Sequence, residues 1–132
     1  MAAAFAAGAD GIQMGTRFVS SLESPVHENF KGAIVNGSEQ GTYILNKKAK
    51  PCIRALKTEL TDKIYEEGLM DMSALSGIKD LYFGGDMNAA PALAGQSIGL
   101  INEVLPVEQI IKQTMQEFNS VCESLSNSKF EL

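Results

Sequence analysis

The residues with the clearest chemical meaning lie in the segment GIQMGTRF, residues 11–18. A short apolar run at 11–14 ends in the pair Gly15-Thr16. Glycine lets a phosphate group approach the backbone closely, and N–H groups at the start of a helix donate hydrogen bonds to it. The Thr16 hydroxyl and the Gln13 amide offer further donors. The segment predicts a phosphate-binding turn, and a purely structural Gly-Thr turn is the alternative that the residues leave open.

The apolar run at 11–14 is expected to be a short buried strand. An alanine-rich helix over residues 1–7, closed by Gly8, comes before it. Buried strands of this type occur in parallel sheets that helices cover on both faces. The sequence offers this strand no partner of the same kind. We therefore expect an α/β chain, mostly helical, that is part of a larger fold.

The rest of the chain is expected to be mainly helical, because its apolar residues often recur at spacings of three and four. Ser, Pro and Gly mark the expected helix boundaries. The predicted segments are a helix at 25–36 started by Ser24, a polar connection at 38–50 with an apolar run at 43–45, a helix at 51–67 ended by Gly68, an irregular stretch at 68–88 with a short helix at 73–82, a helix at 91–101 and a long helix at 107–125. We expect a single domain over residues 1–132.

The composition narrows the classes of partner. A net charge of -5 and a pI of about 4.8 disfavour nucleic acid and membrane surfaces, because like charges repel their phosphates. No apolar run approaches the roughly 20 residues of a membrane helix. The start of the chain lacks the basic residues of a secretory signal. Cys52 and Cys122 are expected to be reduced, so the features together predict a cytoplasmic protein.

Four other residues invite a functional role, and each has a simpler explanation. His27, the only histidine, is expected to cap or pack the start of a helix. Asp86 has no neighbouring His or Cys, so we expect a turn residue and predict no metal site. Cys122 lies on the apolar face of the last predicted helix and is expected in the core. Cys52 lies in a basic stretch, which leaves a reactive thiol open, and is expected to be a structural thiol.

Three segments taken together, GADGIQMGTRF, ESPVH and GDMNAAPALAGQSIGLI, resemble the C-terminal part of the nitronate monooxygenase family. That family, formerly called 2-nitropropane dioxygenases, comprises FMN-dependent (β/α)8-barrel enzymes and includes flavin-dependent enoyl-acyl-carrier-protein reductases. The resemblance covers residues 1–125 and implies the C-terminal fragment of an FMN-binding (β/α)8 TIM barrel. Residues 1–18 would supply the last barrel strand and the phosphate turn, and residues 24–125 a helical C-terminal region.

The resemblance implies FMN as the cofactor and assigns two segments to it. The residues matching the strand that holds the FMN phosphate are Gln13, Met14, Gly15 and Thr16, and those matching a segment that folds back towards the flavin are Ala94, Gly95 and Gln96. Arg17 and Phe18 are expected to anchor the turn. The family's strand-seven Gly-Gly motif, catalytic histidine and substrate pocket match nothing in this sequence. We therefore predict no catalytic residue here and expect this chain to be inactive alone.

For the complete enzyme the resemblance implies a small nitronate or an enoyl thioester as substrate, with NAD(P)H as an electron donor. Two other interpretations stay open. A barrel of the inosine-monophosphate dehydrogenase type has a similar turn at strand eight, although Gln13 and residues 94–96 favour the flavin family. A non-enzymatic helical module would dock a partner on the apolar face of residues 106–125. For a standalone chain that face predicts self-association or binding to a complementary barrel fragment.

Overall fold

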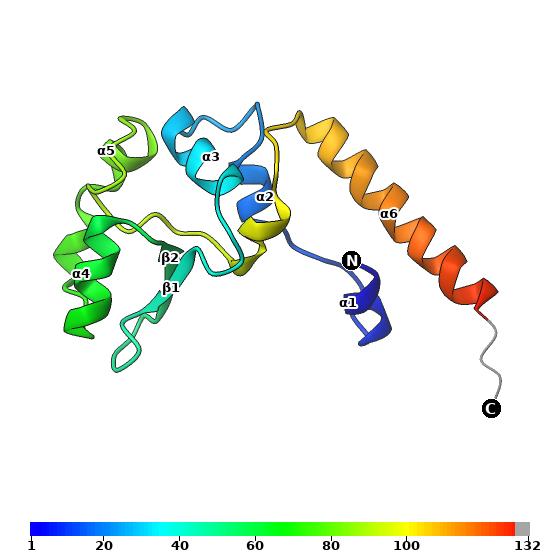
Figure 1. The fold of residues 1–132 in the computed structure, drawn as a ribbon, viewed down its shortest axis with the longest axis horizontal. Helices are drawn as coiled ribbons and strands as arrows, with labels where there is room; N and C mark the ends of the chain where they lie inside the picture. The colour runs from blue at the N-terminus through cyan, green and yellow to red at the C-terminus, as the bar shows by residue number, and fades with distance from the viewer. Residues whose placement is uncertain (129–132) are drawn as a thin grey trace.

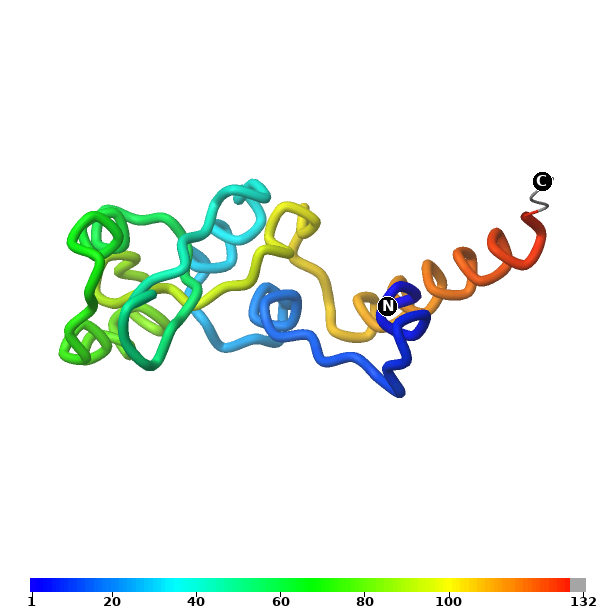
Figure 2. Tube along the Cα trace, turned by 90° about the horizontal axis from the view of Figure 1, so that it is seen from below, coloured from blue at the N-terminus to red at the C-terminus, as the bar shows by residue number. Residues whose placement is uncertain are grey.

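The computed structural model describes residues 1–128 as an α/β chain that is mostly helical. Its elements are α1 (Ala2–Ala6), α2 (Thr16–Val19), α3 (Glu28–Val35), β1 (Thr42–Leu45), β2 (Ile53–Leu56), α4 (Glu59–Glu67), η1 (Met72–Leu75), α5 (Ile78–Tyr82), η2 (Gln96–Leu100) and α6 (Val107–Asn127). Figure 1 shows α6 leaving the rest of the molecule as a long arm. Figure 2 shows an elongated shape, with α6 and α1 at one end and the β1–β2 hairpin with α4 at the other.

The only sheet among the described residues is an antiparallel hairpin of β1 and β2, with Tyr43 opposite Ala55. This corrects two predictions, the connection at 38–50 and the helix at 51–67. The helix begins later, at Glu59, because Thr58 and Thr61 form a capping box that satisfies the first backbone N–H groups. Its end was predicted correctly, because Gly68 adopts a left-handed C-cap with φ 77°.

The predicted strand at 11–14 is not a strand in the structure. These residues lie outside every strand, and α2 follows them directly. A strand needs a hydrogen-bonded neighbour, and the single described sheet contains β1 and β2 alone. The alanine-rich helix before this segment is confirmed as α1, and Gly8 follows it with a φ of 93°.

The predicted helix at 25–36 is shorter than expected at its start. The N-cap is His27 rather than Ser24, because His27 Nδ1 accepts a hydrogen bond from the backbone N–H of Asn29 at 3.1 Å. An imidazole nitrogen is thus the N-cap acceptor, a role that a serine or aspartate oxygen usually has. The prediction that His27 has a capping role is confirmed.

The segment between α4 and α6 differs from the predictions. The short helix expected at 73–82 is divided into η1 and α5, and only η2 is helical within the predicted 91–101 segment. Leu93 instead forms a bridge with Ala55 of β2, which keeps this backbone extended. The long last helix is confirmed as α6, but only Ile110 of it is buried. The prediction of Cys122 in the core is wrong, because that side of α6 faces outward and Cys122 is exposed.

Two apolar clusters hold the body of the molecule. The larger one joins α3, β2, α5, the 90–94 segment and η2, and Phe30, Ile34, Leu81 and Ile98 are all fully buried there. The smaller one lies between the hairpin, α4 and the segment after α4. The larger cluster therefore fixes the segment that was predicted to fold back towards a flavin. No helix within residues 1–128 is long and apolar enough to cross a membrane.

Candidate functional site

A groove of about 900 Å³ runs between the predicted phosphate turn, η2 and the first half of α6. Its lining residues are Met1, Ile12, Gln13, Met14, Gly15, Thr16, Arg17, Gly95, Ser97, Leu100, Ile101, Asn102, Glu103, Ile110, Gln113, Thr114, Gln116 and Glu117. Nine of these eighteen residues are amides, hydroxyls or glycines, six are apolar and three are charged. The groove is therefore suited to a ligand with both apolar and polar parts, which a few backbone and side-chain donors hold in place.

Thr16 and Gly95 lie together in one part of the groove lining. The Thr16 Oγ1 accepts a hydrogen bond from the backbone N–H of Gly95 at 2.9 Å, across 79 positions of sequence. A hydroxyl that accepts in this way keeps its own proton, which can still be donated to a ligand oxygen. This hydrogen bond, called the Thr16–Gly95 clasp below, brings the two predicted flavin segments together.

The 92–95 segment is itself held by β2. The N–H of Leu56 donates to the carbonyl of Ala92 at 2.8 Å, and the N–H of Ala94 donates to the carbonyl of Arg54 at 3.2 Å. Ala92 and Ala94 are buried in the larger apolar cluster. Gly95 thus reaches the clasp from a rigid support, which preorganises this part of the groove.

Arg17 anchors the turn from behind, as predicted. Its guanidinium donates to the carbonyl of Glu103 at 2.8 Å, and its own carbonyl accepts from the Ser20 hydroxyl at 2.9 Å. Partial burial lowers the pKa of Arg17, and the nearby Glu103 carboxylate opposes this effect. The side chain stays charged, because an arginine pKa remains far above neutral pH.

The front of the turn is open. A Cβ added at Gly15 would meet nothing within 4 Å, and Gly15 is exposed. Gly15 is also the N-cap of α2, and the first backbone N–H groups of a helix have no partner within it. Open space in front of free N–H donors and a hydroxyl fits the phosphate of a nucleotide or flavin.

The comparisons with known proteins decide the family. A family model described as nitronate monooxygenase matches residues 1–117. The chain belongs to the nitronate monooxygenase family. The solved structures that are similar to it include two of FabK. FabK from Thermotoga maritima is 38% identical with a TM-score of 0.88, covering 96% of this chain and 42% of that chain. A point mutant of the same FabK is 40% identical with a TM-score of 0.83, covering 96% of this chain and 40% of that one. The chain spans about two-fifths of the length of these structures.

The resemblance stated from the sequence is therefore confirmed, and with it membership in a family of flavin-dependent oxidoreductases. Five of the seven residues predicted to contact the cofactor line the groove: Gln13, Met14, Gly15, Thr16 and Gly95. Ala94 is buried in the apolar cluster, and Gln96 is exposed outside the groove lining. A flavin contact by any of the seven residues stays a prediction.

A groove-lining role for the polar side of α6 was not predicted. Gln113, Thr114 and Glu117 line the groove, yet only the apolar positions of this helix were used to predict it. Their spacing of one, three and four residues places them on one helix face. This polar helix face could have been recognised from the sequence, because a row of polar residues beside the apolar face of a helix indicates a second packing surface.

The remaining candidate residues lie elsewhere. His27 packs against Gly85, and Asp86 closes its own turn by accepting from the backbone N–H of Asn88 at 2.9 Å. The turn role predicted for Asp86 is confirmed. Cys52 and Cys122 are both free and exposed. Within residues 1–128, no three His, Cys, Asp or Glu side chains gather closely enough to hold a metal ion.

Replacing Thr16 with valine tests the clasp. Valine keeps the shape but removes the acceptor of the Gly95 N–H, so the free energy of unfolding should fall by about 1 kcal/mol. Thr16→Ser keeps the hydroxyl and should stay within about 0.5 kcal/mol of the wild type. Urea unfolding followed by circular dichroism measures both. Equal stabilities of the valine and serine variants would mean that the hydrogen bond contributes nothing.

Proposed function

We propose that this chain forms the phosphate-binding part of an FMN-dependent oxidoreductase of the nitronate monooxygenase type. The observation that carries the proposal is the Thr16–Gly95 clasp, which holds two segments of the family resemblance together in the lining of one groove. Membership in the nitronate monooxygenase family supports a flavin cofactor. The same match favours this interpretation over an inosine-monophosphate dehydrogenase type of barrel and over a purely helical module.

The residues of the turn have the chemistry that a flavin phosphate requires. Backbone N–H groups at Gly15 and at the start of α2 would donate to phosphate oxygens, and the Thr16 hydroxyl would add one donor. Gln13 and Met14 would border the phosphate, since both line the groove. Arg17 keeps the turn in place through Glu103 and does not have to contact the ligand.

When bound, FMN supplies the electron transfer, and the protein supplies binding, orientation and exclusion of water. Among the described residues, the ionisable side chains that line the groove are Arg17, Glu103 and Glu117. His27 lies elsewhere, as the cap of α3. We therefore assign the proton transfers of the complete enzyme to groups outside this sequence, with a nitronate or an enoyl thioester as substrate. This chain alone should turn over neither.

The test is a titration of the chain with FMN and with riboflavin, followed by flavin fluorescence. Riboflavin has the same ring system but no phosphate. FMN should bind at least about tenfold more tightly, because the phosphate adds charge-assisted hydrogen bonds at the turn. The variant Gly15→Ala should remove this preference, since its methyl group would occupy the open space in front of the turn.

Gly32→Ala is the matched control, because a Cβ there also meets nothing within 4 Å and Gly32 lies in α3, outside the groove lining. It should leave the FMN preference unchanged. Equal affinities for FMN and riboflavin, or no binding of FMN, would contradict the assignment of a phosphate site to this turn.

A further inference from the structure

The positive charges of this acidic protein are gathered in the hairpin. Residues 41–58, called the basic hairpin below, contain five of the 11 Lys and Arg residues and no Asp or Glu. All 16 acidic residues lie outside it. Although the net charge of the chain is -5, the charges are separated: the hairpin is positive and the rest of the chain is negative. Figure 1 shows the hairpin projecting beside α4, at the end of the molecule away from α6.

The lysines of the basic hairpin are available for an external partner. Lys47, Lys48, Lys50 and Lys57 are all exposed. The only ion pair within 4.0 Å in the described chain joins Lys112 and Glu108 in α6. The hairpin lysines are thus not neutralised by carboxylates of residues 1–128, although acidic residues of α4 border the surface.

Two of these lysines are held in place by aromatic rings. The rings of Tyr43 in β1 and Tyr65 in α4 stack with centroids 4.2 Å apart and an interplanar angle of 17°. Lys57 Nζ lies 4.7 Å from the Tyr43 ring centroid, and Lys47 Nζ lies 4.8 Å from that of Tyr65. Cation–π contacts of this kind restrict long side chains. Less side-chain entropy is then lost when a partner binds.

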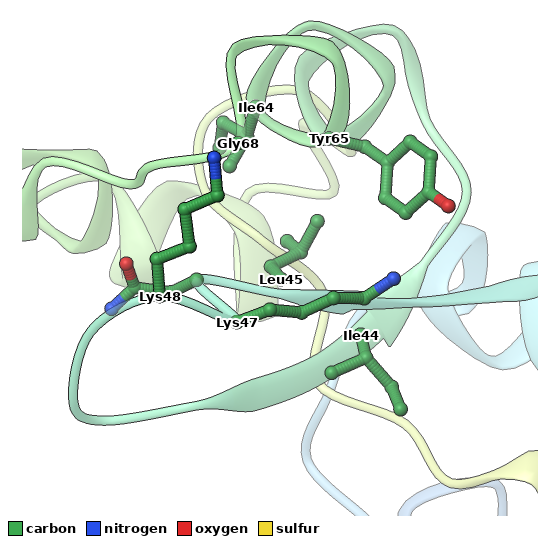
Figure 3. A pocket seen from close by; sticks show the side chains of 8 residues that line it. Ile44, Leu45, Lys47, Lys48, Ile64, Tyr65 and Gly68 are labelled. Atoms are coloured by element: carbon green, nitrogen blue, oxygen red, sulfur yellow. The ribbon is translucent and has the colours of Figure 1, made fainter.

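A hollow of about 230 Å³ lies beside the held lysines, between the hairpin and the end of α4. Figure 3 shows Leu45 and Ile64 pointing towards each other in it, while Lys48 extends towards Gly68 and Lys47 runs along the hairpin below Tyr65. The hollow thus has an apolar floor and a positively charged rim. It has room for one aliphatic side chain of a partner.

We propose that the basic hairpin and the adjoining end of α4 form a docking surface for an acidic protein segment, in which an apolar side chain is flanked by carboxylates. The carboxylates meet the held lysines, and the apolar side chain enters the hollow. Complementary charge of this kind sets both the orientation and the association rate of partners. The surface does not involve the groove, so this inference stands independently of the flavin proposal.

The same features argue against other anionic partners. Proteins that bind single-stranded nucleic acid offer free aromatic faces on which bases stack. Here Tyr43 and Tyr65 stack on each other, and a lysine lies over each ring. Binding to a membrane surface needs several apolar side chains that insert into the lipid. Leu45 and Ile64 are buried at the floor of the hollow, and Ile44, which is 36% exposed, is the one exposed aliphatic side chain in its lining.

The test measures binding of a synthetic amphipathic peptide, with a central leucine flanked by glutamates, by fluorescence anisotropy with the full chain. The peptide should bind in a saturable way, and more weakly as salt screens the charges. Lys47→Glu/Lys57→Glu should weaken binding at least about tenfold. The matched control is Lys79→Glu/Lys112→Glu, which changes the net charge equally outside the hairpin and should alter affinity less than about twofold.

The peptide itself provides the second comparison. Replacing its glutamates by glutamine should abolish binding, and replacing its leucine by serine should weaken it. Circular dichroism verifies that both double variants keep the fold. An equal loss in the two double variants, no saturable binding of the glutamate peptide, or tighter binding of polyuridylate or of phosphatidylserine vesicles would each overturn the proposal.

Discussion

Replacing Phe30 with alanine should lower the free energy of unfolding by about 3–5 kcal/mol. Phe30 is fully buried in the larger apolar cluster, where its ring meets Tyr82 edge-on at a centroid distance of 5.2 Å. Alanine would leave a cavity that the surrounding helices cannot close completely. Domains of this size are stable by only about 5–15 kcal/mol, so the loss is a large part of the total. Chemical unfolding in urea measures it.

Phe83→Ala is the control for that change, because Phe83 is 62% exposed. It should cost no more than about 0.5 kcal/mol. In Phe30→Ala, the part of the groove around Gly95 should also unfold at a lower urea concentration than in the wild type. The residues that hold Gly95 belong to the same cluster as Phe30. A loss below about 1 kcal/mol for Phe30→Ala would mean that this cluster is not the main core of the chain.

Gly85→Ala should be nearly as damaging, for two separate reasons. Gly85 has a φ of 75°, a conformation that costs an L-residue about 1–2 kcal/mol. In addition, an alanine Cβ would collide with the His27 ring, and overpacking of this kind costs about 1–3 kcal/mol. Thermal and urea unfolding of the variant give the sum of the two effects.

Two further variants separate the strain from the collision. Gly68 has a φ of 77° with open space around it, so Gly68→Ala should show the backbone cost of about 1–2 kcal/mol alone. Removing the ring in His27→Ala/Gly85→Ala should recover the collision part, so the double variant should lose less than the sum of the single ones. Strict additivity would show that His27 does not restrict this turn.

The sequence predicted best those features that depend on neighbouring residues. The long helix α6 follows from apolar periodicity, and the end of α4 follows from Gly68. The hairpin was missed because Ile53, Leu56, Leu60 and Ile64 have helical spacing although a strand and a helix share them. Thr58, three residues before Thr61, was the signal that separated them, because this pair starts the helix.

The candidate site shows the same limit. Gly15 and Thr16 are recognisable from a local Gly-Thr pattern and from the family resemblance. Their contact with Gly95 is not, because no local rule connects residues 79 positions apart. The β2 pairing that carries Gly95 depended on the hairpin that the periodicity concealed. The predicted strand at 11–14 failed for the opposite reason, since the described chain provides it with no neighbour.

The attachment of α6 has a mechanical consequence. The helix has 21 residues and is therefore about 30 Å long. Its first turn is fixed by Glu23, whose carboxylate accepts from the Val107 N–H at 2.9 Å, while Arg17 holds the carbonyl of Glu103 just before it. A rotation of one degree at this attachment moves the far end by about 0.5 Å. Farther along the helix, the Phe118 ring also packs against Phe5 of α1 at a centroid distance of 5.2 Å, so a shift of the predicted phosphate turn should displace α6 together with α1.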